Sequence, residues 1–554
     1  MTSQTAAAPA RFDAVLVRAR HWLRVAAGVR PAYVLAALVG IQWIAVLALA
    51  LTVRHNGWLY YAGGDQLWHY SGAYVMAHGH LPRALVGYGW SILLLPISAF
   101  AGPSLVSALP AMVLFNTVVL LPVALLCIYG IAARIAGRLF GYFAAALWVA
   151  LPYLGILSVQ PGYHQKYTEL TLPQALGLSS VPDFPSTVGL IVAAYLALRA
   201  AEGASWHAAA GSGLAAGYAI AIKPSNALFL VAPAVLLLVV RRRQVLPFAA
   251  GLAPALLTLA LWKYRGLGEI AAAPAEPTRL ALGGGLLDRI HRPELNSWAH
   301  LHQVVLGLRE HFWVARVIEW LPLAGCTALL LRSLRGFLLV GTWFIAYLLV
   351  KGTYVLASID DASFFRLLMP AFPAYVLLGA AVVLLVPRAR ARPAPVTAVP
   401  QRRLTLAVAV AAVVFAVVPL GVIAATPRLH DGGQQALQVG ISLIPVSTTI
   451  DAHAVSVGDG VRISWRPQRT RGGSLFYHVF RGHEPDVGCG GRLNGASDDC
   501  RLYADDVGAT RSSTFVDHPP PGVWIYRVGV AANWLNDPTL GDVYVISPPV
   551  SPRS

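Results

Sequence analysis

Long apolar runs recur along most of this chain. Each run of about 20 residues is long enough to cross the hydrocarbon core of a bilayer as a helix, in which every backbone polar group is bonded internally. We therefore predict a polytopic α-helical membrane domain over residues 31–426. About eleven spans are expected, with approximate bounds 31–53, 106–131, 139–157, 186–201, 207–222, 224–240, 244–263, 313–331, 335–351, 366–387 and 404–426.

Arginines cluster in alternate loops between these runs. The N-terminal segment 1–30 is basic, and Arg134, Arg241, Arg335 and Arg402 mark later basic loops, although the loop at 201–207 is weakly basic. Cytoplasmic loops carry an excess of Lys and Arg. The pattern predicts a multi-pass protein of the plasma membrane, with a cytoplasmic N-terminus and an outward C-terminus. Four segments then face outward, namely 54–105, 158–185, 264–312 and 352–365.

The periodicity changes after a linker at 427–449. Over residues 450–554, stretches such as "VRISWRP" and "GVWIYRVGVAANW" alternate apolar and polar residues between Gly, Pro and Asp turns. We predict an extracytoplasmic β-sandwich. It resembles a fibronectin type III domain, with Trp465 as the early-strand core residue and Tyr526 in the late strand. Cys489 and Cys500 would form a disulfide outside the cell, or remain two free thiols in a reducing compartment.

Composition agrees with a membrane protein. The 554 residues are 57% hydrophobic and only 12% charged, about half the charged share of a soluble domain. The formal net charge of +17 would suggest a nucleic-acid partner in a soluble protein. Here much of the arginine lies in short loops between apolar runs, where it sets topology. We therefore expect the lipid bilayer as a partner, and no nucleic acid.

The first outward segment carries the densest polar chemistry. In a helix that begins at Asp65, His69 lies four residues on and shares the same face. A carboxylate held at the membrane surface can act as a general base once burial and a hydrogen-bonded neighbour set its pKa. The alternative is that Asp65 only caps the helix after Gly63 and Gly64.

The layout of a first span, an outward loop with an early acid and about ten further spans resembles the GT-C membrane glycosyltransferases. This superfamily includes protein O-mannosyltransferases and aminoarabinose transferases. The resemblance covers about residues 31–426 in layout. In motif it covers "GGDQLWHYSGAYVMAHGHLP" (63–82), "IKPSN" (222–226) and "DDASFFRLLMPAFPAY" (360–375). Many relatives carry paired acids in the first loop, whereas Gln66 follows Asp65 here.

The resemblance implies transfer of a sugar from a polyprenyl-phosphate donor to an envelope glycan, lipid or protein on the outer face. Asp65 would be the general base, while Lys223 and Arg366 would hold the donor phosphate; the alternative for such cations is snorkelling at the interface. The possible site-lining residues are Gln66, His69, Tyr70, Glu169, Asp183, Asp360 and Asp361. No helical metal-ligand pair stands out, so no cofactor or metal is assigned.

Two other functions compete with the transferase. A lipid-carrier flippase or transporter of envelope precursors would place ionisable residues in mid-span and interrupt helices at matching positions in two halves. Nearly all charges lie at predicted span ends, which favours the enzyme. A non-catalytic anchor for the β-domain would need one span only.

Overall fold

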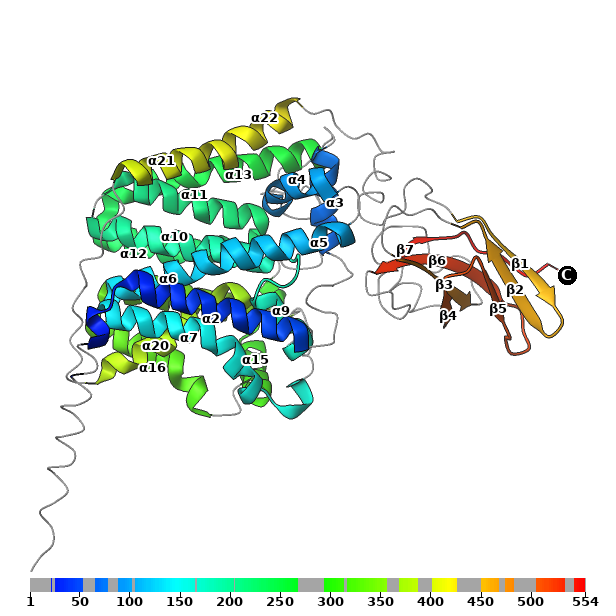
Figure 1. The fold of residues 1–554 in the computed structure, drawn as a ribbon, viewed down its shortest axis with the longest axis horizontal. Helices are drawn as coiled ribbons and strands as arrows, with labels where there is room; N and C mark the ends of the chain where they lie inside the picture. The colour runs from blue at the N-terminus through cyan, green and yellow to red at the C-terminus, as the bar shows by residue number, and fades with distance from the viewer. Residues whose placement is uncertain are drawn as a thin grey trace, which may run out of the picture.

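The computed structural model describes a helical domain and a separate β-domain (Figure 1). The described residues are 21, 25–52, 65–77, 88–101, 105–164, 167–203, 205–267, 293–312, 316–355, 368–386, 401–425, 450–467, 474–482, 505–533 and 543–553. Cys489 and Cys500 lie outside them, so their pairing stays a prediction.

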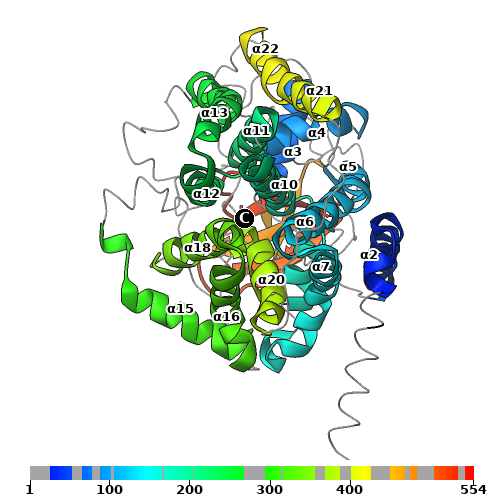
Figure 2. The same cartoon turned by 90° about the vertical axis from the view of Figure 1, so that its left-hand side faces the viewer.

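The helical domain is a bundle of nearly antiparallel helices, which a view turned by 90° shows almost end on (Figure 2). Its first half contains α2 (Pro31–Thr52), α3 (Asp65–Ala77), α4 (Gly89–Ala101), α5 (Leu105–Leu114), the π-helix η1 (Phe115–Leu120), α6 (Leu121–Ala136), α7 (Arg138–Ser158), the π-helix η3 (Tyr167–Thr171), α9 (Leu172–Ala175) and α10 (Asp183–Gly203). Its second half contains α11 (Trp206–Ile222), the 3₁₀ helix η4 (Pro224–Leu230), α12 (Val231–Arg241), α13 (Val245–Leu267), α15 (Trp298–His311), α16 (Arg316–Arg332), α17 (Leu334–Gly336), α18 (Thr342–Gly352), the 3₁₀ helix η8 (Met369–Ala371), α20 (Phe372–Ala381), α21 (Gln401–Ala412) and α22 (Val418–Ala425).

Seven helical tracts of the described chain are long and apolar enough to cross a membrane. They are Pro31–Leu51, Ala108–Ala136, Arg138–Ser158, Asp183–Gly203, Pro224–Leu261, Leu334–Gly352 and Arg402–Gly421. The predicted multi-span helical architecture is therefore confirmed. The count of about eleven stays a prediction, because α11 and α16 have 17 residues each and Met369–Leu385 is shorter than a full span.

Helix α4 was not expected from the sequence, which placed it inside one outward loop, 54–105. Its 13 residues are strongly apolar but too short to cross a bilayer, so a search for runs of about 20 residues passes over it. The buried side chains of Trp90 and Leu94 join one core cluster with Tyr218 and Ile222 of α11. Helices α3 and α4 therefore pack on the bundle as a hairpin.

Helices α11 and α13 approach each other closely through glycine. Gly213 and Gly217 are four residues apart and share one face of α11, a spacing typical of tight membrane-helix pairs. A Cβ on Gly213 would lie 1.9 Å from the Phe248 carbonyl oxygen, and one on Gly251 would lie 1.9 Å from the Ala210 carbonyl oxygen. This contact admits no side chain on either helix.

Gly213→Leu should therefore destabilise the bundle by more than the ~1–3 kcal/mol typical of overpacking, because the obstacle is backbone. The measurement is the apparent Tm of detergent-purified protein, read from the loss of the monodisperse size-exclusion peak after heating. Gly40→Leu is the matched control, since no atom lies within 4 Å of a Cβ there. Equal Tm values for the two variants would contradict this packing.

The β-domain is a sandwich of two antiparallel sheets. One sheet has the order β1 (Ala452–Val457), β2 (Gly460–Trp465), β5 (Thr514–Asp517). The other has the order β4 (Asp505–Thr510), β3 (Ser474–Gly482), β6 (Ile525–Asn533), β7 (Val543–Ile546). Buried side chains of both sheets form the core, among them Ile463, Trp465 and Val528. The predicted sandwich is confirmed, while its membership of the fibronectin type III family stays a prediction.

A charged cluster joins the two sheets of the sandwich. The Tyr526 hydroxyl donates to Asp517 Oδ2 at 2.8 Å, and Arg481 Nη1 donates to the same carboxylate at 3.0 and 3.2 Å. The Arg481 guanidinium also lies 4.8 Å from the centre of the Trp524 ring. Burial, with the bond to Asp517 second, raises the pKa of Tyr526, so this hydroxyl keeps its proton.

Asp517→Ala should destabilise the β-domain by about 3–5 kcal/mol, since it leaves Arg481 largely buried without its counter-charge. Pulse proteolysis in urea, with detection of the C-terminal fragment, would measure the change. Asp459→Ala is the matched control, because this carboxylate is almost fully exposed beside His518. A loss no larger than that of Asp459→Ala would count against a structural role for the cluster.

Candidate functional site

Helix α3 places the acid singled out from the sequence. The predicted helix is present and begins at Asp65, of which the structure describes the backbone. Gln66, His69 and Tyr70 follow on it and are buried. Ser91 of α4 donates its hydroxyl to the His69 carbonyl at 2.8 Å, which ties the hairpin together. Burial raises the pKa of Tyr70, with Tyr74 adding to the shift, so Tyr70 is a neutral phenol and no base.

The segment from Gly177 to Asp183 packs against this hairpin. Gly177 turns the chain with a φ of 72°. The Asn116 side-chain amide donates to the carbonyl oxygens of Gly177 and Ser179, both at 3.0 Å, and Trp90 Nε1 donates to the Ser180 carbonyl at 2.8 Å. The Ser180 hydroxyl donates to Gln66 Oε1. The start of α10 is thereby held beside the start of α3.

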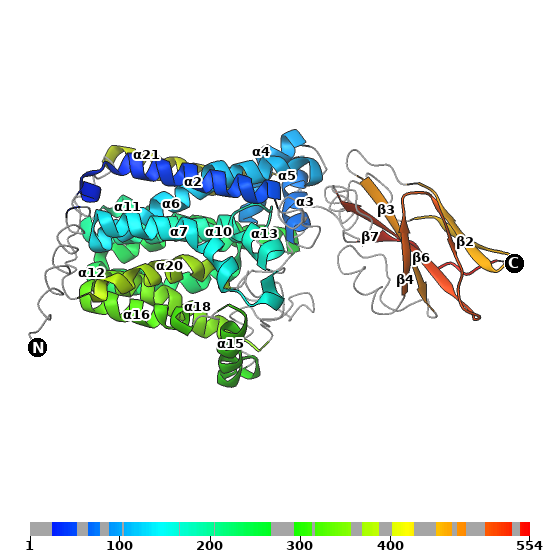
Figure 3. The ribbon, with the colours of Figure 1, turned by 60° about the horizontal axis from the view of Figure 1, so that its bottom comes forward.

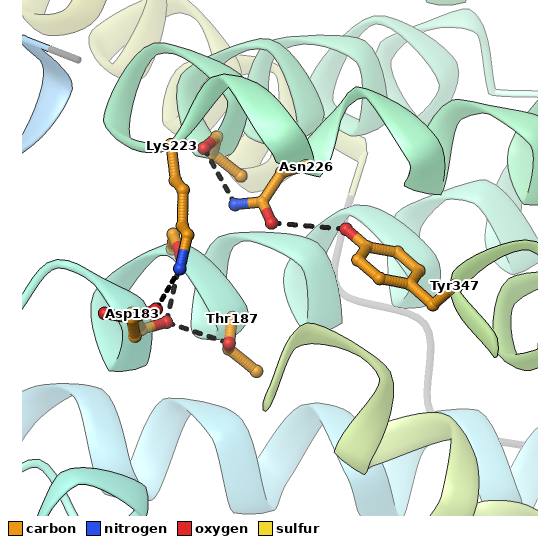
Figure 4. Close-up of polar contacts among 7 residues, drawn as sticks. Asp183, Thr187, Lys223, Asn226 and Tyr347 are labelled. Carbon is orange, nitrogen blue, oxygen red and sulfur yellow. Dashed lines mark hydrogen bonds and ion pairs between the residues drawn. The ribbon is translucent and has the colours of Figure 1, made fainter. Parts of the chain in front are cut away.

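An ion pair lies where this segment enters α10. Asp183 is the first residue of α10 and has no exposed surface, and its Oδ1 accepts a hydrogen bond from Lys223 Nζ (Figure 4). The Lys223 side chain is 19% exposed. A buried carboxylate needs such a partner, because an unpaired charge in a low-dielectric interior is costly. The Lys223 ammonium is thus bound to a buried carboxylate, while the side chain as a whole keeps some exposed surface.

The backbone around Lys223 is fixed by a second polar network. Lys223 ends α11 in an extended conformation, where Pro224 prevents the helix from continuing. Asn226 is fully buried; its amide donates to the Ala219 carbonyl at 3.0 Å and its oxygen accepts from the Tyr347 hydroxyl of α18 at 3.2 Å (Figure 4). The sequence "IKPSN" therefore forms a helix end rather than a flexible loop.

Glycine brings the hairpin onto this helix end. The Tyr218 hydroxyl of α11 donates to the Gly89 carbonyl at the start of α4. A Cβ on Gly89 would lie 2.7 Å from the backbone nitrogen of Ile222, the residue before Lys223. No side chain other than hydrogen fits at this position, so the hairpin and the end of α11 form one unit.

These elements share one end of the bundle. Helices α3, α4 and α9 lie there and α22 ends there, whereas α2 begins at the opposite end (Figures 1 and 3). The structure thus brings Gln66, Asp183, Lys223 and the backbone of Asp65 into one connected region. Glu169 lies nearby along the chain, in the π-helix η3, ahead of α9. Arg366, Asp360 and Asp361 lie outside the described residues, and the proposed roles of all these residues stay predictions.

A separate apolar cavity of about 290 Å³ opens beside α18. Phe344 and Leu348, which lie on α18 close to Tyr347 in sequence, line this cavity. The other lining residues are Leu151, Leu154, Gly155, Ser158, Val159, Tyr167, Leu308, Phe312, Ile318, Leu321, Leu368, Ala371, Phe372 and Tyr375. Their polar groups are used internally: the Tyr167 hydroxyl donates to the Pro152 carbonyl at 2.7 Å and that of Tyr375 to the Ile318 carbonyl at 3.2 Å. The described lining is mainly apolar and suits a hydrocarbon chain better than a sugar.

Sequence reasoning missed Ser180, Asn226 and Tyr347. The partners of these buried polar residues lie 114 to 121 residues away in the chain, so a local sequence pattern does not reveal the contacts. The one local signal was Asn226 two residues after Pro224, at a helix end. Within the described part of the chain, no group of three His, Cys, Asp or Glu side chains is placed to hold a metal ion.

Comparisons with known proteins gave structural similarities only. No protein-family model and no curated protein matches the sequence. Among solved structures, the chain is similar to ArnT from Cupriavidus metallidurans bound to undecaprenyl phosphate, with 17% identity over 71% of each chain and a TM-score of 0.38. It is also similar to the oligosaccharyltransferase AglB from Archaeoglobus fulgidus in complex with an inhibitory peptide and a dolichol-phosphate, with 14% identity, 73% of this chain and a TM-score of 0.37.

A second crystal structure of the Archaeoglobus fulgidus oligosaccharyltransferase, in the apo form, gives a TM-score of 0.39 at 14% identity. The chain spans 57% of the length of that oligosaccharyltransferase in both forms.

Lys223→Met should lower the free energy of unfolding by about 3–5 kcal/mol, because it strands the buried Asp183 carboxylate. Asp183→Asn combined with Lys223→Met removes both charges and should recover most of that loss. Apparent Tm values of the purified variants would measure both effects. A double variant no more stable than Lys223→Met alone would contradict the pairing.

Proposed function

We propose that this chain is a GT-C-type glycosyltransferase of the plasma membrane. It transfers a sugar from a polyprenyl-phosphate donor to an envelope glycan, lipid or protein on the outer face. The observation that carries the proposal is the packing of the helix that begins at Asp65 against the segment that leads into the Asp183–Lys223 pair. A base and a phosphate-binding cation can thereby serve one substrate.

The chemistry assigns a role to each group. Asp65 accepts the proton of the acceptor hydroxyl while the oxygen of that hydroxyl forms a bond to the anomeric carbon of the sugar. The bond from that carbon to the phosphate oxygen breaks, and polyprenyl phosphate leaves with the bonding electrons. Lys223, which Asp183 orients, stabilises the negative charge of the leaving phosphate. Arg366 is proposed as the second cation from the motif "DDASFFRLLMPAFPAY".

The charge distribution along the bundle supports an outward site. Arg134, Arg241, Arg332 and Arg402 lie at or near ends of α6, α12, α16 and α21, as expected if these are the cytoplasmic helix ends. The apolar cavity beside α18 would accept a lipid chain, because none of the described residues that line it is charged. The C-terminal sandwich follows α22, which ends on the side of the proposed site (Figure 1), and would bind glycan or acceptor there.

Transport of a lipid carrier is the second candidate function. It would place ionisable groups in mid-span. Among the described residues of the helical domain, Asp183 is the one fully buried carboxylate, and it is the first residue of the tract Asp183–Gly203, not a mid-span residue. This placement favours phosphate binding at the membrane surface over transport through the bundle.

Asp65→Asn should lower the transfer rate by about 10²–10⁴, the usual contribution of a general base, and leave donor binding intact. The assay would follow release of free undecaprenyl phosphate from a panel of undecaprenyl-phosphate hexoses and pentoses, with envelope extract as acceptor. Binding of undecaprenyl phosphate itself would be measured in parallel.

The variant with Asp183→Asn and Lys223→Met is the converse control. It should bind undecaprenyl phosphate at least tenfold more weakly, because one phosphate–ammonium contact is lost. If Asp65→Asn releases undecaprenyl phosphate at the wild-type rate, Asp65 is not the base. If the double variant binds undecaprenyl phosphate as tightly as wild type, Lys223 is not part of the phosphate site.

A further inference from the structure

The hydrogen bond from the Ser180 hydroxyl to Gln66 Oε1 joins two segments 114 residues apart. Both residues are 1% exposed, so solvent contributes little to either. Gln66 directly follows Asp65 on α3, and Ser180 precedes Asp183 by three residues. The contact therefore spans the gap between the proposed base and the residue that orients the proposed phosphate ligand.

This pair is poorly suited to a purely stabilising role. The Gln66 Nε2 atom is buried and has no hydrogen-bond partner among the described residues. Reversing the amide would exchange its two ends and leave the oxygen without a partner instead. A buried polar group that lacks a partner costs free energy, and replacing both residues of such a pair by apolar ones of similar shape can be neutral or stabilising. Stability alone would therefore favour an apolar pair.

Ser180 is a fixed point on its own side of the contact. Its carbonyl accepts from Trp90 Nε1 at 2.8 Å, and the carbonyl of the preceding Ser179 accepts from Asn116. Gln66 is thus anchored to a segment that α4 and η1 already hold in place. The hydrogen bond from Ser91 to the His69 carbonyl lies one turn further along α3. The Ser180–Gln66 bond is therefore a contact of the first turn of α3, which includes Asp65.

We propose that Gln66 and Ser180 are positioning residues that hold the first turn of α3 at a fixed offset from the Asp183–Lys223 pair. Gln66 takes no part in the chemistry; it places Asp65 relative to the bound donor. This inference rests on the proposed transferase function. It predicts that losing the contact lowers kcat, while the site for the donor phosphate stays intact.

The test is the double variant Gln66→Met with Ser180→Ala, which removes both polar groups and preserves most of the volume. We expect kcat for undecaprenyl phosphate release to fall by about 10- to 100-fold, the effect of a misplacement of about 1 Å. The Kd for undecaprenyl phosphate should stay within about twofold of wild type, and the apparent Tm should be equal or higher. Hydrogen exchange of residues 65–77 should become faster.

Two further variants make the result specific. Gln66→Glu keeps an oxygen for the Ser180 hydroxyl and should retain more activity than Gln66→Met. Ser212→Ala is the matched control, since it removes a buried serine hydroxyl that donates to the Ala193 carbonyl at 2.8 Å between α11 and α10, away from α3. Its kcat should be unchanged.

A kcat within twofold of wild type in the double variant would overturn the inference, and so would a loss of kcat matched by a lower Tm and weaker binding. Full activity in Asp65→Asn would remove Asp65 as the base, and the positioning role would fall with it, because that role is to place the Asp65 carboxylate. If the wild type releases no undecaprenyl phosphate, the proposed function fails. Unchanged exchange of 65–77 in the double variant would then overturn the positioning role as well.

Discussion

A carboxylate with no exposed surface requires a counter-charge, and the packing around the proposed site follows from meeting that requirement. Asp183 begins α10, and Lys223 reaches it from the end of α11. For this to happen the two helix ends must lie at one level in the membrane. Pro224 and Asn226 then end α11 at the right residue, and Tyr347 fixes Asn226 from α18. One electrostatic constraint thereby sets the relative height of three helices.

The same constraint distinguishes Lys223 from a lysine that only anchors a helix at the membrane surface. A snorkelling lysine extends freely towards headgroups. Lys223 is instead paired with a buried acid, which reduces the conformational freedom of its side chain. An ammonium prepared in this way loses less entropy when it meets a phosphate. The glycine contact at Gly89 brings the hairpin of α3 and α4 to the same place.

Much of the architecture could be predicted from the sequence because long apolar runs and alternating strands carry their own signal. The helix that begins at Asp65 and the sandwich after residue 450 were both expected. Helix α4 was not, because 13 apolar residues fall below the length of a span. In the site, Lys223 was named from its place at a span end and Asp183 as an acid of the second outward loop. The partner of each, and the buried contacts of Ser180 and Asn226, depend on segments that meet only in three dimensions.

The docking of Gly89 has a consequence for how the chain is made. The hydroxyl that donates to the Gly89 carbonyl belongs to Tyr218, 129 residues later in the chain. The surface on which α4 packs therefore does not exist when α4 leaves the ribosome. Helix α4 is too short to insert alone as a span. The hairpin must therefore wait at the membrane surface until α10 and α11 have been inserted and paired. The proposed site is therefore completed late in biogenesis, after α11 has been made.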